Sequence, residues 1–220
     1  MSQVSTPVVA YRWFVFCITL GYFLYRFVDT APGYFGAQFR FLTVWALTAS
    51  TISAWLMLRL SMGWSQSRHE VFASVCVVMN ATVVLMYWKI YLTDPALFYG
   101  ADGRQNAWHQ EYFIHGLGPL LQAIDAFLIL GVFRPIRKII GIVILIPVAY
   151  ILWVELLVHP LNDAPVGRVT AGLPYRFLNN MEVFDRMGFY ITTVVTMLAL
   201  MFAAWVLAWL LRRVGWTQVN

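Results

Sequence analysis

The chain has 220 residues, of which 61% are hydrophobic and only 11% are charged. A soluble domain carries roughly 25% charged residues, so this composition cannot cover a water-facing surface and predicts a polytopic membrane protein. The net charge of +5 does not indicate nucleic-acid binding, because the Lys and Arg residues do not cluster on one soluble face. We interpret them instead as signals of membrane orientation.

Six stretches of about twenty mostly apolar residues qualify as membrane-spanning helices. They are residues 8–28, 41–60, 71–92, 113–133, 139–158 and 187–211. The alternating pattern of barrel strands is not found. The expected fold is therefore all-α, with residues 1–220 forming a single six-helix membrane domain. Cys17 and Cys76 both lie within apolar runs, which excludes a disulfide scaffold.

Six spans place both termini on one side of the membrane, and basic residues fill the short loops on that side. By the positive-inside rule this predicts cytoplasmic termini. The basic residues on this side are Arg12, Arg59, Arg68, Arg134, Arg137, Lys138, Arg212 and Arg213. The opposite side carries two long loops, residues 93–112 and 159–186, whose aromatic and proline content favours packed lids. We expect the functional site at that face.

Three residues with suitable chemistry share the face opposite the termini. Thr43 begins the second span, His115 begins the fourth and His159 closes the fifth. A Thr hydroxyl is a weak nucleophile until a base takes its proton, and His is the usual base near neutral pH. Thr43 is thus a candidate nucleophile and His115 a candidate base. The alternative for each is a local hydrogen bond that caps or braces its helix.

Two carboxylates each precede a histidine by four residues, which places both members of a pair on one helical face. Glu111 precedes His115, which is the geometry of a base oriented by an acid, although Glu111 as a solvated loop charge is the alternative. Glu155 precedes His159 and lies within the bilayer. A carboxylate there either belongs to a functional site or makes a structural hydrogen bond between spans. Asp125 lies roughly 15 Å deeper than His115, so it lines a cavity or pairs with another span.

Two further arginines on this side, Arg40 and Arg176, could hold a substrate carboxylate, with a plain interfacial anchor as the alternative. A zinc site would need ligands brought together from distant segments, because the chain has no HExxH motif or comparable spacing. The histidines are all terminal or in loops, which disfavours haem between spans. We therefore predict no metal and no cofactor.

Four stretches in order carry a family pattern. They are Tyr34-Phe35-Gly36 with Arg40-Phe41-Leu42-Thr43, then His115-Gly116-Leu117-Gly118-Pro119, then Tyr150-Ile151-Leu152-Trp153 with His159, and finally Pro174-Tyr175-Arg176-Phe177-Leu178. Through them the chain resembles the androgen-induced protein family of intramembrane threonine hydrolases, which cleave fatty acid esters of hydroxy fatty acids. Gly116 and Arg176 depart from the family pattern.

The resemblance implies that Thr43 is the nucleophile, that His115 is its partner and that the substrate is a membrane lipid ester. It gives His159 a matching position but no role. The competing hypothesis is a non-enzymatic bundle, either a small-molecule transporter or an assembly subunit of an oligomer or larger membrane complex. The absence of an inverted repeat in the sequence disfavours transport. A metal-dependent lipid amidase is a third hypothesis.

Overall fold

The computed structural model describes residues 5–28, 33–95, 107–162 and 172–216. The secondary structure within these ranges is helical, without a strand. The elements are α1 (Thr6–Val28), η1 (Ala37–Arg40), α2 (Leu42–Ser61), α3 (Glu70–Thr93), α4 (Trp108–Tyr112), η3 (Phe113–Leu117), α5 (Gly118–Ile124), η4 (Asp125–Leu130), α6 (Ile136–Trp153), η5 (Val154–Val158), α7 (His159–Asn162), α8 (Arg176–Asn179) and α9 (Val183–Arg213).

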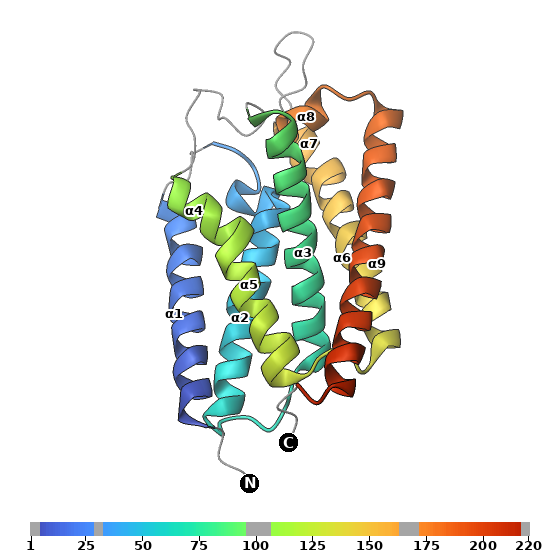
Figure 1. Ribbon diagram of the computed structural model, residues 1–220. Helices are drawn as coiled ribbons and strands as arrows, with labels where there is room; N and C mark the ends of the chain where they lie inside the picture. The colour runs from blue at the N-terminus through green and yellow to red at the C-terminus, as the bar shows by residue number, and fades with distance from the viewer. Residues whose placement is uncertain (1–4, 29–32, 96–106, 163–171, 217–220) are drawn as a thin grey trace.

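Six long helical rods form the bundle (Figure 1). The first three rods are α1, α2 and α3. The fourth runs from α4 to η4, the fifth runs from α6 to α7, and the sixth is α9. The predicted all-α bundle is thereby confirmed, with span ends that shift by a few residues. The largest shift is at the fourth rod, which begins at Trp108 within the segment predicted as a loop. Of the two loops predicted as lids, residues 96–106 and 163–171 lie outside the described residues. The described part of the second loop contains α7, α8 and the first turn of α9.

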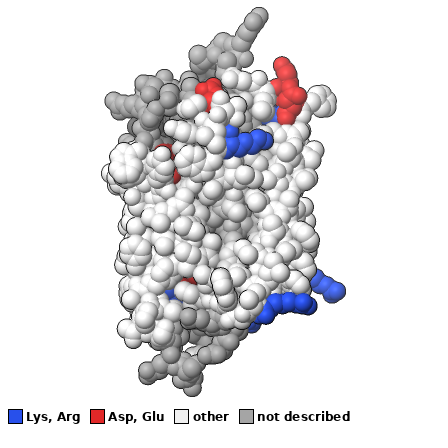
Figure 2. Space-filling view, viewed as in Figure 1, with Lys and Arg blue, Asp and Glu red and all other residues white. Residues whose placement is uncertain are grey.

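The outer surface is that of an integral membrane protein with several spans. Five of the described helical segments are long and apolar enough to cross a membrane: Thr6–Val28, Glu70–Thr93, Trp108–Leu130, Ile136–Asn162 and Val183–Arg213. On the face in Figure 2, a broad uncharged band separates the charged side chains at the two ends of the molecule. This band matches the hydrocarbon layer of a bilayer, where an exposed charge is costly.

The remaining rod, α2, has spanning length but is not among the five segments that are apolar enough to cross a membrane. It lies inside the bundle and packs most extensively against α1 and α3. Its small polar residues meet other helices. Ser50 and Asn80 of α3 hydrogen-bond each other, with the Asn80 amide donating over 2.8 Å, and Gln122 donates to the Ser50 carbonyl at 3.0 Å. Small residues at such contacts let helices approach closely, so the low hydropathy of α2 reflects its central position.

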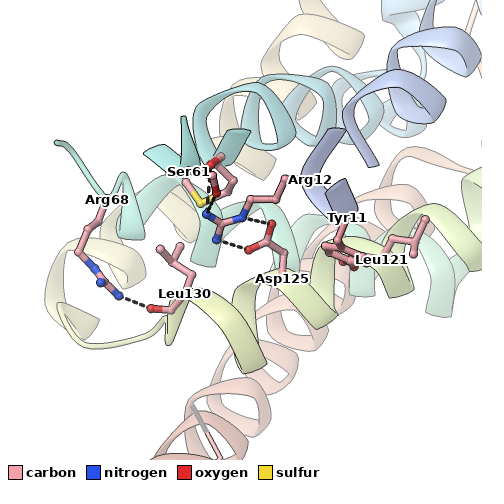
Figure 3. Close-up of polar contacts among 8 residues, drawn as sticks. Tyr11, Arg12, Ser61, Arg68, Leu121, Asp125 and Leu130 are labelled. Atoms are coloured by element: carbon pink, nitrogen blue, oxygen red, sulfur yellow. Dashed lines mark hydrogen bonds and ion pairs between the residues drawn. The ribbon is translucent and has the colours of Figure 1, made fainter. Parts of the chain in front are cut away.

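A buried ion pair ties α1 to the fourth rod near the termini (Figure 3). The Arg12 guanidinium binds both carboxylate oxygens of Asp125, Nε to Oδ2 at 2.9 Å and Nη2 to Oδ1 at 2.6 Å. Its remaining nitrogen, Nη1, donates to the Met57 carbonyl and to the Ser61 hydroxyl of α2. Arg12 is only 3% exposed. Arg12 therefore pairs with Asp125 inside the bundle, and its interpretation as an orientation signal stays a prediction.

Two other basic residues at this end bind carbonyls where the fourth rod stops. Arg68 donates to the Leu130 carbonyl, and Arg212 of α9 donates to the Val132 carbonyl at 2.6 Å. The last carbonyls of a helix have no partner within it and carry partial negative charge, so arginines are suitable partners. These contacts connect the loop after α2 and the end of α9 to the turn after η4.

The start of α1 and the end of α9 lie at the same end of the bundle (Figure 1). The first turn of α2, the helix α4 and the helix α7 lie at the other end. Thr43, His115 and His159 therefore share the end of the bundle that the span count predicted. That the termini face the cytoplasm remains a prediction.

Candidate active site

The chain reaches Thr43 through a tight turn at Gly36. This glycine has φ +81°, a left-handed conformation that is strained for other residues, and a Cβ here would lie 3.2 Å from the Trp153 ring. The turn leads into η1, whose Phe39 carbonyl accepts hydrogen bonds from both Trp45 and Trp153. The segment before Thr43 is thus held against α6, which fixes where α2 begins.

Two tyrosine hydroxyls surround the start of α2. The Leu42 backbone N–H approaches both Tyr150 and Tyr175, each at 3.1 Å, and the Tyr150 hydroxyl donates to the Arg40 carbonyl at 2.8 Å. The first N–H groups of a helix have no partner within it, and no side chain of α2 itself caps them. Tyr150 of α6 and Tyr175 before α8 therefore supply the cap from distant parts of the chain.

Tyr175 also contacts Thr43 directly, through both the side chain and the backbone of the threonine. Burial raises the pKa of Tyr175 above its ordinary value, so its hydroxyl stays protonated at neutral pH. A neutral hydroxyl can donate one hydrogen bond and accept others. Tyr175 is thus placed to orient the Thr43 hydroxyl.

The backbone at His115 departs from helical geometry because of Pro119. His115 has φ −105° and ψ +19° within the π-helical segment η3. A proline has no N–H to offer the carbonyl four residues before it, and its ring clashes with that carbonyl. The His115 carbonyl is instead satisfied by the Trp88 indole N–H of α3 at 2.8 Å. Single turns of π-helix of this kind often occur at functional sites.

The ring of His115 is held on two sides. Its Nδ1 lies 3.0 Å from the Glu111 carboxylate, as the four-residue spacing predicts. Its face stacks on the Tyr87 ring of α3 with the centroids 3.7 Å apart and the planes 5° apart, and the Tyr87 hydroxyl in turn hydrogen-bonds Glu111. None of the described residues hydrogen-bonds Nε2 of His115, so that nitrogen is the one available for proton transfer.

Thr43 and the helix that carries His115 line a common cavity. The cavity does not include His115 itself among its lining residues, which are Thr19, Thr43, Ala46, Leu47, Ser50, Asn80, Val83, Phe113, Ile114, Gly118 and Pro119. At about 10 Å³ it holds no more than roughly one water molecule. Thr43 and His115 do not hydrogen-bond each other in this arrangement. The cavity would have to widen to admit any group larger than a water molecule, and a direct contact between the two side chains would need them to approach.

Glu155 and His159 form a second polar cluster at the same end. The Glu155 carboxylate accepts a hydrogen bond from Tyr190 at 2.7 Å and lies 2.8 Å from Nε of Arg186, both on α9. His159 lies 3.6 Å away through Nδ1. Of the two interpretations of Glu155, these contacts match the hydrogen bond between spans. The buried Nε2 of His159 has no hydrogen-bond partner among the described residues.

Arg40 lies just before Thr43, with its guanidinium 4.1 Å above the Tyr34 ring and 4.8 Å from the Phe41 ring. Burial lowers the pKa of Arg40, but an arginine keeps its charge at neutral pH. No carboxylate pairs with it among the described residues, so it can receive an anionic group. Asp125, in contrast, is committed to Arg12 at the other end of the bundle. The backbone of Arg176 opens α8, while its side chain lies outside the described residues.

Three tyrosines of this site were not predicted as site residues from the sequence. Tyr87, Tyr150 and Tyr175 contribute the ring and hydroxyl contacts around His115 and Thr43, yet an isolated tyrosine in an apolar run carries no signal of its contacts. Tyr150 and Tyr175 do occur within the family motifs, and those motifs were the only sequence signal that could have found them. Among the described residues, no three His, Cys, Asp or Glu side chains group as metal ligands.

Comparison with protein families gives one match, to the model of the FAR-17a/AIG1-like proteins, over residues 8–208. The chain belongs to this family. The match runs from the first turn of α1 almost to the end of α9 and includes Thr43, His115 and both tyrosines of the α2 cap. The membership inferred from the four motifs is therefore confirmed. No curated protein and no solved structure matches the chain.

Proposed function

We propose that this FAR-17a/AIG1-like protein is an intramembrane lipid ester hydrolase with Thr43 as nucleophile and His115 as general base. One observation carries the proposal: Glu111 holds Nδ1 of His115 and leaves Nε2 available, on a helix that shares a cavity with Thr43. A carboxylate that binds one nitrogen while the other takes a proton is the arrangement of serine hydrolase triads. Family membership supports the same chemistry.

The reaction requires two steps. In the first, Nε2 of His115 takes the Thr43 proton while Oγ attacks the ester carbonyl carbon, and the carbonyl electron pair moves onto its oxygen. The intermediate then collapses, the alcohol leaves with the proton from His115, and an acyl-Thr43 ester remains. In the second step His115 takes a proton from water as the water oxygen attacks the acyl carbon. The acyl–Oγ bond then breaks, His115 returns the proton to Oγ of Thr43, and the fatty acid is released. No cofactor takes part.

The substrate class we propose is a lipid ester with long chains, such as a fatty acid ester of a hydroxy fatty acid. Thr43 lies in the first turn of α2, so an ester can reach it at the headgroup level while both chains stay in the bilayer. Arg40 is a suitable partner for a free carboxylate on such a lipid, because it is charged, partly buried and not paired with an acid among the described residues.

The decisive experiment is labelling with a fluorophosphonate, which reacts with activated hydroxyl nucleophiles and loses fluoride. Wild-type protein in membranes should be labelled, and Thr43→Ala and His115→Ala should not be. Thr48→Ala is the matched control, because Thr48 lies on the same helix and its hydroxyl bonds only the Val44 carbonyl. Labelling that survives Thr43→Ala would refute the assignment of the nucleophile.

A wild-type protein that neither reacts with the probe nor turns over lipid esters would favour the alternative, a non-enzymatic bundle that serves in an oligomer or a membrane complex. The transport form of that alternative assigns Asp125 and Glu155 to a pathway. Both carboxylates are held by arginines, at 2.6 Å and 2.8 Å respectively. Carboxylates neutralised in this way fit helix association better than transport.

A further inference from the structure

The hydroxyl of Thr19 is buried in the cavity beside Thr43 without a hydrogen-bond partner. Thr19 lies on α1, is 1% exposed, and its Oγ is among the few buried polar atoms left unsatisfied in the described part of the chain. A buried polar group without a partner is destabilising, commonly by about 1–3 kcal/mol. Such a group in an otherwise well-bonded bundle needs an explanation.

Other threonines within the long helices show that this is not a general property of the bundle. Their hydroxyls donate to the carbonyl four residues earlier at 2.7–2.9 Å. They are Thr48, Thr51, Thr82, Thr93, Thr192, Thr193 and Thr196. The same bond is open to Thr19, on a regular helix, yet its hydroxyl does not form it. The Thr19 O–H is therefore free to donate into the cavity.

The remaining polar walls of the cavity are already committed. Ser50 and Asn80 hydrogen-bond each other, and Thr43 contacts Tyr175. The other lining residues are apolar or glycine, namely Ala46, Leu47, Val83, Phe113, Ile114, Gly118 and Pro119. A buried water usually makes two to four hydrogen bonds, so a cavity with one free donor is a poor site for a structural water. A single carbonyl oxygen, which needs donors only, suits it better.

We propose that Thr19 is an oxyanion donor: its hydroxyl binds the ester carbonyl oxygen as Thr43 attacks. This inference rests on the proposed function. When the bond from Thr43 Oγ to the carbonyl carbon forms, the carbonyl electron pair moves onto the oxygen, and the Thr19 O–H donates to that negative charge. A donor in a site with little water stabilises such charge far more than it would in water. Without substrate the Thr19 hydroxyl has no hydrogen-bond partner, because the donor is already in the position where the oxygen would bind.

The test compares Thr19→Val, which removes the hydroxyl and keeps the shape, with Thr19→Ser, which keeps the hydroxyl. Loss of one oxyanion donor lowers turnover on the order of 10²- to 10³-fold. We expect Thr19→Val to slow fluorophosphonate labelling and ester turnover by that order with little change in KM, and Thr19→Ser to restore most of both. Thr82→Val is the control, since Thr82 is equally buried at 1% and its hydroxyl bonds the Val78 carbonyl.

Two outcomes would overturn the inference. The first is that Thr19→Val reacts with the probe at the wild-type rate and turns over the ester normally, which would make the hydroxyl inert. The second is that it reacts normally but accumulates acyl-Thr43, detected by mass spectrometry, which would assign the hydroxyl to the attacking water. If Thr19→Val does not fold, Thr19→Ala removes the same donor and takes its place. Failure of the proposed function is distinguishable, because wild-type protein would then show no labelling that depends on Thr43.

Discussion

A histidine acts as a general base when one ring nitrogen is held and the other is available, and the contacts of His115 divide its nitrogens in this way. Glu111 holds Nδ1 at 3.0 Å, and the parallel Tyr87 ring fixes the plane in which Nε2 points. In the proposed reaction, Glu111 would orient the ring and stabilise the imidazolium that forms. Catalysis should therefore depend on the charge of Glu111 and on the position of Thr43.

Replacing Glu111 by Gln keeps the size of the side chain and removes its charge. General acid–base catalysis contributes roughly 10²- to 10⁴-fold, so we expect ester turnover to fall on the order of 10²-fold with little change in melting temperature. Glu182→Gln, at an exposed carboxylate before α9, is the control. Unchanged ester turnover in Glu111→Gln would contradict the orienting role.

Tyr175→Phe removes the hydroxyl that contacts Leu42 and Thr43. We expect turnover to fall about tenfold or more, because a misplaced nucleophile is costly, and stability to fall by about 1 kcal/mol for the lost hydrogen bond. Turnover and thermal melting measure the two effects. Tyr112→Phe, at a residue that is 59% exposed, should change neither. Wild-type turnover in Tyr175→Phe would show that Tyr150 alone positions the helix start.

At the scale of the element, the fourth rod contains an irregular turn at His115. Pro119 removes one backbone hydrogen bond, the His115 backbone leaves helical geometry, and Trp88 of α3 satisfies the carbonyl that is left. A regular helix over the same residues would rotate His115 relative to Glu111 and Tyr87. The proline therefore helps to set the direction of the His115 ring.

Pro119→Ala restores an N–H that can reach the His115 carbonyl. We expect a more regular helix, unchanged or higher thermal stability, and a loss of turnover on the order of 10²-fold, the effect of displacing a reacting group by about 1 Å. Pro147→Ala is the control, because that proline also lies inside a helix but is outside the site. Its turnover should stay at the wild-type level. Full activity in Pro119→Ala would show that Trp88 and Tyr87 alone hold the ring.

The elements themselves could be predicted from hydropathy, because long apolar runs have few alternatives in a membrane. The pairing of Glu111 with His115 also follows from spacing alone. The π-helical turn, the capping of α2 by Tyr150 and Tyr175 and the free hydroxyl of Thr19 could not be predicted. Each depends on residues that are distant in sequence and meet only in the folded bundle.

At the scale of the whole molecule, the ends of the bundle are held by different forces. The end near the termini contains the buried pair of Arg12 and Asp125 and the arginines that bind the turn after η4. At the Thr43 end, α1 meets its neighbours mainly through rings, such as Tyr22 stacked on Phe113 with centroids 4.0 Å apart and Phe27 beside Phe39. The ion pair is expected to dominate the stability of the α1 contact.

Asp125→Asn leaves the Arg12 charge buried without its counter-ion. Breaking one partner of a buried pair costs about 3–5 kcal/mol, so we expect a marked fall in the melting temperature of the detergent-solubilised protein. The double variant Arg12→Met with Asp125→Leu removes both charges and should recover much of that stability. Equal melting temperatures for Asp125→Asn and wild type would mean that the pair contributes little to the bundle.

The position of the Arg12 pair has a mechanical consequence for α1. A charged contact in a medium of low dielectric strongly resists separation, whereas stacked rings can slide over one another at small cost. We therefore expect α1 to be held most firmly near Arg12 and to move more easily at its far end, where Thr19 lines the narrow cavity and Tyr22 stacks on Phe113. In the proposed reaction, a lipid chain would thus part the helices at the end of α1 that lacks the ion pair.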